Sequence, residues 1–427
     1  MKHILIFILF ISNLLNAQQD TVSGISGYSK HSDTGLTDLV NSAIKTNVNL
    51  EPVELEQKLL SARIDQAGYQ PSPMLEFMID DLPVNFSDAG MYKVNYSQPL
   101  KLFGKLNAME SLARINSLRP DIQKEALQIE LIKMVKENYF MLSVNERLLS
   151  FNNEFKEIMN SITGSLEIKY SVGKGSQYDI LKSNNEYQKL LLEEIDLSNN
   201  KKIFINNLRT LTNIDLPDDF MTKNLNILLK IIPPDMDTAK LISEMKLFNT
   251  DYKLLDQQSK ENNIENTIAE LERKPDMSLL TGYKYNSGKQ ESFLTFGIGV
   301  ELPFMPWNDK RIDALISEKI IMEKKINSEV KSLDINLKNE LKNIIVKINS
   351  SQEKIKYLTE VLIPQTEETF KSSLISYETA ANQFIDLLDT YRTLRVNNEM
   401  LVEEETNYLI LISGLEKLIG KQILTIN

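Results

Sequence analysis

Long parts of the chain repeat apolar residues at steps of three or four. From Asn308 to Ile363 there is no Gly and no Pro, and Lys, Glu, Asn and Ser fill the positions between the apolar ones. The apolar positions of this tract include Ile326, Val330, Leu333, Leu337, Leu341, Ile344 and Ile348. Residues spaced in this way share one face of an α-helix, so the pattern predicts a continuous amphipathic helix.

Three more tracts of this kind occur, at about residues 122–162, 178–211 and 383–418. The tract from Asn308 would alone be roughly 80 Å long as an α-helix. Helices of such length do not fit inside a compact globule. The pattern therefore favours a coiled coil or an elongated helical barrel.

Four short segments alternate between apolar and polar residues instead. The clearest are Met91–Gln98 and Ser292–Leu302, and the weaker ones are Pro73–Asp80 and Met277–Tyr285. A period of two predicts strands. Their order along the chain predicts two β-hairpins, each inserted between long helices.

Alternating segments of about ten residues, apolar on one face, are typical of a membrane β-barrel. A soluble sheet with one face on a core would give the same pattern strand by strand. Four strands are too few to close a barrel, and an open sheet edge is unfavourable in lipid. If these strands lie in a membrane, several chains must contribute, and three chains would supply twelve strands.

The two halves of the chain resemble each other. The segment "YSVGKGSQYDIL" from Tyr170 aligns with "YETAANQFIDLL" from Tyr377, which places Asp179 opposite Asp386. The repetition predicts a duplicated unit of helix, hairpin, long helix, tight turn and returning helix. We expect repeat 1 over residues 38–222, a linker over 223–238 and repeat 2 over 239–427.

The N-terminus has the features of a secretory signal peptide over residues 1–17. Lys2 and His3 precede an apolar run, Ile4–Leu15, and Ala17 is a small residue suited to a cleavage site. Residues 18–37 are rich in Ser, Gly and Asp, which predicts a flexible leader to which we assign no role. No later run of about 18 uncharged apolar residues exists, so no transmembrane helix is expected.

Composition narrows the possible chemistry. The chain has no Cys and two His, and its net charge is -11. The lack of Cys excludes disulfides, thiolate metal sites and a lipidated N-terminal Cys. With His3 in the signal peptide, only His31 remains, which argues against a His-based metal site or triad. The acidic charge argues against nucleic acid as a partner. No set of nucleophile, base and orienting group is present, so we expect neither an enzyme nor a cofactor.

Asp386 and Asp389 stand three residues apart at the start of the last helical tract. Carboxylates at this spacing are common as helix-surface charges or caps. An acid–base pair would need a cleft that no other motif supplies. A metal site without His or Cys would suit only a weakly held hard cation. A ring of carboxylates from several copies of the chain is the remaining interpretation.

Six segments carry a family resemblance, in order along both halves. They are the signal peptide, "YSQPLKLFGK", "YSVGKGSQYDIL", "VELPFMPWNDKRIDA", "VLIPQTEETFKSSLISYE" and "FIDLLDTYRTL". Together they resemble the TolC family of outer-membrane efflux proteins. The segment "LPFMPWNDK" is closer to the heavy-metal efflux branch than to the drug branch.

The resemblance implies a mainly α-helical fold with a small β part. The expected assembly is a homotrimer with a twelve-stranded barrel in the lipid of the cell outer membrane and a helical barrel extending into the periplasm. The expected partners are a periplasmic adaptor protein and an inner-membrane transporter of the RND type. The chain would be a conduit for exported substrates such as metal cations or drugs.

The resemblance also implies roles at the periplasmic tip. Asp386 and Asp389 fall on positions that line the narrow entrance, where three copies would form two rings of carboxylates. Tyr377 and Asp179 match two positions of the links that hold the aperture shut, and the arginine of these links is replaced by Asn382. Val172, Gly173 and Lys174 match the adaptor-docking turn. Ala380 stands where the second turn usually has Gly, so that turn is expected to be built differently.

Two other functions compete with this one. A channel for type I protein secretion would use the same conduit, and the sequence does not separate it from an efflux duct. A secreted coiled-coil adhesin or structural protein would explain the helical tracts and the signal peptide, but not the strands inserted once per repeat.

Overall fold

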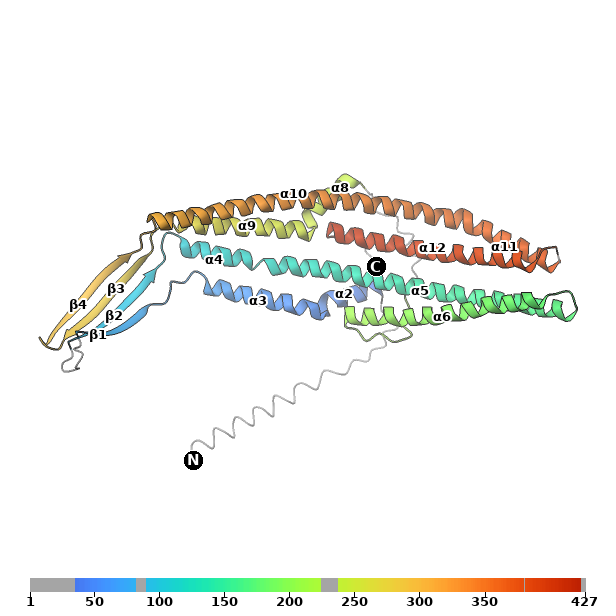
Figure 1. Ribbon diagram of the computed structural model, residues 1–427, viewed down its shortest axis with the longest axis horizontal. Coiled ribbons are helices and arrows are strands. Elements are labelled where there is room, and N and C mark those ends of the chain that lie inside the picture. Colours follow the sequence, from blue (N-terminus) through green and yellow to red (C-terminus); the bar gives the residue numbers. More distant parts are fainter. Residues whose placement is uncertain (1–34, 82–89, 224–236, 380, 424–427) are drawn as a thin grey trace, which may run out of the picture.

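The computed structural model describes residues 35–81, 90–223, 237–379 and 381–423. The molecule is elongated, with a β-sheet at one end and the turns of two long helical hairpins at the other (Figure 1). The predicted signal peptide, residues 1–17, lies outside the described residues. So do residues 18–34 of the predicted leader and 224–236 of the predicted linker.

The first half of the chain forms the first long hairpin, α5–α6, and the shorter helices that lead to it. The α-helices described there are α2 (Leu36–Thr46), α3 (Glu51–Gln66), α4 (Lys105–Asn116), α5 (Arg119–Ser171) and α6 (Gln177–Thr212). Pro120 stands in the first turn of α5, where its missing N–H removes no intrahelical bond. Helix α2 starts at Leu36, so its first two residues overlap the end of the leader expected over residues 18–37.

The second half repeats this order. Its described helices are α8 (Thr238–Phe248), α9 (Thr250–Leu271), α10 (Pro306–Tyr357), α11 (Ile363–Glu378) and α12 (Phe384–Ile419). Helices α11 and α12 form the turn end of the second hairpin, and α10 runs back toward the sheet (Figure 1). Among the helices of the described ranges, none combines the length and the apolarity needed to cross a membrane.

The long tract predicted from Asn308 does not end at Ile363. A π-helical turn, Leu358–Leu362, joins α10 to α11, and the amide of Ile363 donates to the oxygen of Leu358. Pro364 follows in the first turn of α11. Because proline cannot donate to the residue four positions earlier, the wider turn accommodates the gap and the helix continues to Glu378.

The four predicted strands form one antiparallel sheet. They are β1 (Met74–Asp80), β2 (Met91–Leu100), β3 (Met277–Asn286) and β4 (Glu291–Val300), in the order β1-β2-β3-β4. The two hairpins are joined by pairing of β2 with β3, in which Met91 lies opposite Asn286 and Leu100 opposite Met277. Strands β1 and β4 are the edges of the sheet.

Large apolar side chains of the sheet are exposed. On β4, Leu294, Phe296 and Ile298 are 73%, 75% and 72% exposed, and on β1 Phe77 is 72% exposed. No described helix covers this sheet, which extends beyond the helices at one end of the molecule (Figure 1). A soluble sheet would bury such a face on a core, so this sheet needs an apolar environment or further protein around it.

The helices bury two hydrophobic clusters. The larger lies in the middle of the molecule and draws on α2, α5, α6, α8, α10 and α12. The smaller lies toward the hairpin turns. There Tyr391 of α12 packs edge-on against Phe155 of α5 at 5.5 Å between ring centroids, and its hydroxyl donates to the oxygen of Phe155 at 3.2 Å. This smaller cluster holds the two hairpins against each other.

The ends of α6 and α12 show the internal repeat in three dimensions. The side-chain amide of Asn47 donates to the oxygen of Leu211 at 2.8 Å, and that of Asn249 donates to the oxygen of Leu418 at 2.9 Å. Both asparagines are buried. Each satisfies a helix-terminal carbonyl that has no intrahelical donor.

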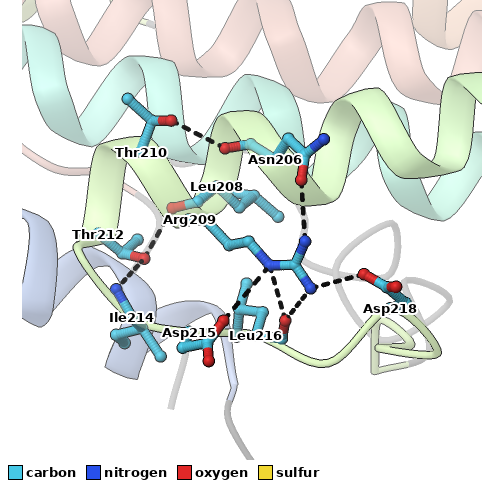
Figure 2. A network of polar contacts seen from close by, with 9 residues as sticks. All are labelled: Asn206, Leu208, Arg209, Thr210, Thr212, Ile214, Asp215, Leu216 and Asp218. Atoms are coloured by element: carbon cyan, nitrogen blue, oxygen red, sulfur yellow. Dashed lines mark hydrogen bonds and ion pairs between the residues drawn. The ribbon is translucent and has the colours of Figure 1, made fainter.

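A second contact at the helix ends also recurs in both halves, made by a basic side chain in the first half and by an acidic one in the second. Arg209 donates to the oxygen of Leu216 at 2.7 Å and to Asp218 at 2.7 Å (Figure 2). In the other half, Glu416 accepts the amide of Ile423 at 2.9 Å. Both pairs join a side chain in the last turns of the helix to the backbone seven residues later. These contacts support the duplicated unit, while its division at residues 38–222, 223–238 and 239–427 stays a prediction.

Candidate functional site

The first hairpin turn joins α5 to α6 at the end of the molecule farthest from the sheet. Gly173 has φ 72, a left-handed conformation that suits glycine. The amide of Lys174 donates to the oxygen of Lys169 at 2.8 Å and closes the turn. The Ser176 hydroxyl then accepts the amide of Tyr178 and caps α6. Val172, Gly173 and Lys174 are all exposed, as docking of a partner would require.

The second turn joins α11 to α12. Ala380, predicted to be part of the docking tip, lies outside the described residues. Around it, the amide of Ala381 donates to the oxygen of Ser376 at 2.8 Å. This bond corresponds in the repeat to the bond from Lys174 to Lys169. The closing hydrogen bond is therefore the same in both turns, although glycine occurs only in the first.

Asp386 and Asp389 are exposed on the first two turns of α12. The carboxylate of Asp386 accepts the amide of Gln383 at 3.3 Å, which makes it part of a capping box at the start of the helix. The carboxylate of Asp389 has no hydrogen bond or ion pair within the described residues. A capping role thus accounts for Asp386 but leaves Asp389 without a local explanation.

Tyr377 and Asp179 come together from the two hairpins. Tyr377 is buried and packs on Phe384 at 6.1 Å between ring centroids. Burial raises the pKa of Tyr377, and the nearby Asp179 carboxylate adds to this rise. No hydrogen bond joins Tyr377 to Asp179 within the described part of the chain. The Asn382 side chain is exposed, and it too makes no hydrogen bond among the described residues.

Farther from the turns, charged pairs join α6 to α12. Arg392 binds Glu186, and Arg395 lies 3.0 Å from Glu193. Burial would raise the pKa of Glu186, but hydrogen bonds from Arg392 and Lys189 outweigh it and hold that pKa below its usual value. At Glu193 the effect of burial is larger than the attraction of the Arg395 guanidinium, so the pKa of Glu193 is raised above its usual value. These charged pairs add to the contact that the smaller hydrophobic cluster makes between the two hairpins.

Residues 39–213, which make up most of the first half, match the family model described as outer membrane efflux protein. This match covers less than half of the chain. The first half of the chain is similar to this family, and the hairpin and sheet arrangement agrees with that similarity. No curated protein matches the chain.

Solved structures of this kind share the fold over most of the chain. The chain is similar to CusC, with a TM-score of 0.76 at 15% identity, over 93% of this chain and 96% of CusC. The outer-membrane channel OprN aligns with a TM-score of 0.77 at 15% identity, over 90% and 89% of the two chains. The open state of the Neisseria gonorrhoeae MtrE outer membrane channel gives 0.73 at 14% identity, over 91% and 89%.

Identities this low establish the fold and not the details of function. The family and the fold together confirm the predicted fold class and the location in the cell outer membrane with a periplasmic helical part. Both are those of transport ducts, which confirms that the chain is not an enzyme. The family match of the first half and the shared fold support a channel of the outer membrane efflux type.

Sequence reasoning missed one residue of the tip, Lys169. It stands in the last turn of α5, directly before Tyr170, and its ammonium contacts Tyr377 of the other hairpin. Its charge and its place one residue before the repeated tyrosine were visible in the sequence. Only the structure shows that its side chain crosses to α11 and does not extend into solvent.

Proposed function

We propose that this protein is the exit duct of a tripartite efflux system. It would pass substrates from an inner-membrane transporter and a periplasmic adaptor to the exterior. The observation that carries the proposal is the uncovered sheet at one end of a long helical body. Such a molecule has a part suited to lipid and a part long enough to extend from the membrane toward partners.

The sheet also argues for assembly as a homotrimer. Its edge strands, β1 and β4, pair with β2 and β3 on one side and have no partner strand on the other side within the described residues. An unpaired edge is unfavourable in lipid, because its backbone groups find no water there. Three copies would pair β4 of each chain with β1 of the next and close a barrel of twelve strands.

Asp386 and Asp389 are proposed to line the narrow periplasmic entrance of this trimer. Three copies would form two stacked rings of carboxylates on adjacent turns of α12. Rings of Asp favour cations in a pore. The carboxylate of Asp389 supports this role, because it is exposed and no described residue forms a hydrogen bond or ion pair with it.

The exposed first turn, with Val172, Gly173 and Lys174, is proposed to dock the adaptor, with Ala380 in the second turn. The proposed inner-membrane partner is a transporter of the RND type. The proposed substrates are metal cations or drugs, of which the segment "LPFMPWNDK" favours metal cations. Copurification of the tagged chain with an RND transporter or with an ABC exporter would separate efflux from type I protein secretion.

The direct test of the duct is the conductance of the purified mature trimer in a planar lipid bilayer. We expect cation-selective steps that a trivalent cation added on the tip side blocks. Because the block requires the carboxylate rings, the double variant Asp386→Asn, Asp389→Asn should conduct but resist the block. Asparagine at position 386 can still accept the amide of Gln383, so α12 should keep its cap.

Glu167→Gln is a matched control. Glu167 is an exposed carboxylate of α5 near the same tip, and its loss should leave the block unchanged. Equal loss of block in this control would show general surface charge and contradict the ring. A chain that stays soluble without detergent and does not enter bilayers would refute the duct and leave the secreted coiled coil.

A further inference from the structure

One row of side chains on α12 is left uncovered by the described part of the chain. Helix α12 packs mainly on α5, α10 and α11, which bury the rows on its other sides. The remaining row is exposed at steps of three and four, the spacing that keeps residues on one helix face. From the tip toward the middle of the molecule, this uncovered row consists of Asp386, Asp389, Thr393, Val396, Met400 and Glu403.

Three consecutive glutamates show which way the far end of the row points. Glu404 lies 3.3 Å from the ammonium of Lys354 on α10, and Glu405 binds Arg147 on α5. Successive residues of an α-helix are turned by about 100° from each other. Glu403 therefore points away from both α5 and α10, and it is exposed. No described residue forms a hydrogen bond or an ion pair with its carboxylate.

The corresponding face of α6 in the first half is used differently. In the alignment of the two halves, Lys182 of α6 stands opposite Asp389. Glu186 stands opposite Thr393, and it is buried and binds Arg392 of α12. That face of α6 thus carries a cation and takes part in the contact between the hairpins. The uncovered row of α12 instead carries carboxylates and no Lys or Arg.

The carboxylates of the uncovered row lie at two separate levels. Asp386 and Asp389 are at the tip, and Glu403 lies about four helical turns farther along α12, or about 21 Å. Between them lie Val396 and Met400, which are 51% and 46% exposed. The Debye length is about 8 Å at physiological salt, so charges this far apart in water act independently. A neutral stretch thus separates two charged levels of one row.

We propose that Glu403 sets the preference of the duct for cations at a second level, beyond the entrance. The inference rests on the proposed channel function, in which Asp386 and Asp389 line that entrance. Because Glu403 shares their uncovered row, it faces the same space, and three copies would place three carboxylates around it. A cation that has passed the entrance then meets a second region of negative potential, whereas an anion is repelled twice.

The test is the ratio of cation to anion permeability. It is obtained from the reversal potential of the purified mature trimer in a planar bilayer under a salt gradient. The attraction of one carboxylate at about 4 Å in water raises the local cation concentration about fivefold. We therefore expect Glu403→Gln to lower the permeability ratio about fivefold. Block by a trivalent cation from the tip side should persist, because it requires Asp386 and Asp389.

Glu353→Gln is the matched control. Glu353 is an exposed carboxylate of α10 at the level of Glu403, since Ser351 donates to the oxygen of Glu404 at 3.3 Å. It stands two residues after Ser351, which turns it to the side of α10 away from α12. Its loss should leave the permeability ratio unchanged. An equal fall in the two variants would indicate general surface charge and overturn the role of Glu403.

The absence of Cys allows a second test on the assembled trimer. Glu403→Cys removes the carboxylate and supplies the single thiol of the chain. Modification with a sulfonate-bearing methanethiosulfonate should restore the permeability ratio, in up to three steps for three copies. A trimethylammonium-bearing reagent should lower the ratio further. A structural role of Glu403 would not respond to the sign of the added charge, so equal effects of the two reagents would overturn the proposal.

The outcomes separate the role of Glu403 from the duct itself. An unmodified trimer that prefers cations, with the same permeability ratio in Glu403→Gln, would overturn the second level and leave the duct intact. Loss of the trivalent block in Glu403→Gln would contradict two separate levels. Failure of the unmodified chain to enter membranes would refute the duct, and the role of Glu403 with it.

Discussion

Lys136 of α5 and Glu416 of α12 form an ion pair in the middle of the molecule. The distance is 2.5 Å, and the two side chains are only 3% and 5% exposed. The other oxygen of Glu416 accepts the amide of Ile423, so the carboxylate is well satisfied. Removing charges from water is costly, and one charge left without the other costs most. This pair therefore binds the first hairpin to the second at a point where a single substitution should be severe.

We expect Lys136→Met to destabilise the folded trimer by about 3 kcal/mol, because it leaves a buried carboxylate without its cation. The measurement is the temperature at which the detergent-solubilised trimer dissociates. Lys124→Met is the control, since Lys124 and Glu54 form a pair that is 33% and 49% exposed. Its loss should change stability by less than about 1 kcal/mol. Similar losses in the two variants would show that burial does not govern the effect.

At the scale of elements, helices α6 and α12 both end at a residue in the left-handed conformation, but they do so with different residue types. Asn213 follows α6 with φ 53, and Gly420 follows α12 with φ 82, both in the left-handed region. A Cβ on Gly420 would lie 2.5 Å from the oxygen of Phe248. By contrast, a Cβ on Gly173 in the first tip turn would meet nothing within 4 Å. Space, and not backbone conformation alone, distinguishes these glycines.

Gly420→Ala should therefore destabilise the protein by about 3 kcal/mol, through left-handed strain together with a collision against backbone. Gly173→Ala should cost only the strain, about 1 kcal/mol. Thermal dissociation of the trimer would measure both. Equal loss of thermal stability in Gly420→Ala and Gly173→Ala would contradict the close approach of Gly420 to the backbone of Phe248.

At the scale of the whole molecule, the sheet and the helical body serve different surroundings. None of the described residues covers the apolar face of β4, and the long helices carry charged surfaces suited to water. Within the described residues the outer sides of β1 and β4 have no partner strand, and other copies of the chain could pair them. The fold of one chain is thus incomplete as a membrane structure, and assembly and insertion should depend on each other.

Ile298→Lys tests this dependence. A lysine on a lipid-facing position of a membrane strand costs about 2–4 kcal/mol near the midplane. We expect less heat-resistant trimer in the outer-membrane fraction, measured by electrophoresis of unheated samples. Thr295→Lys lies on the opposite face of the same strand and should assemble normally. Equal assembly of both variants would contradict a lipid-facing role for Ile298.

Much of the architecture could be predicted because its signals are local. Steps of three and four from Ile326 to Ile348 indicate a helix whatever surrounds it, and alternation from Leu294 to Val300 indicates a strand. A proline inside a helical pattern usually ends the helix. Pro364 does not, because the π-helical turn before it lets the helix continue into α11. At the tip, the family resemblance pointed to Tyr377 and Asp179, and in the structure the Asp179 carboxylate lies close enough to raise the pKa of Tyr377. The reach of Lys169 was not predicted, because it depends on how the two hairpins pack.

The sequence by itself determined the helices and strands and the absence of thiol chemistry, and it predicted their duplication and a secretory signal peptide. These follow from periodicity and composition, which each segment carries alone. Only the tertiary structure decided that the two β-hairpins share one sheet and that Lys169 binds Tyr377. Those facts arise from contacts between residues far apart in the sequence, 208 positions in the case of Lys169 and Tyr377. Such contacts depend on the relative placement of whole helices, which local patterns do not encode.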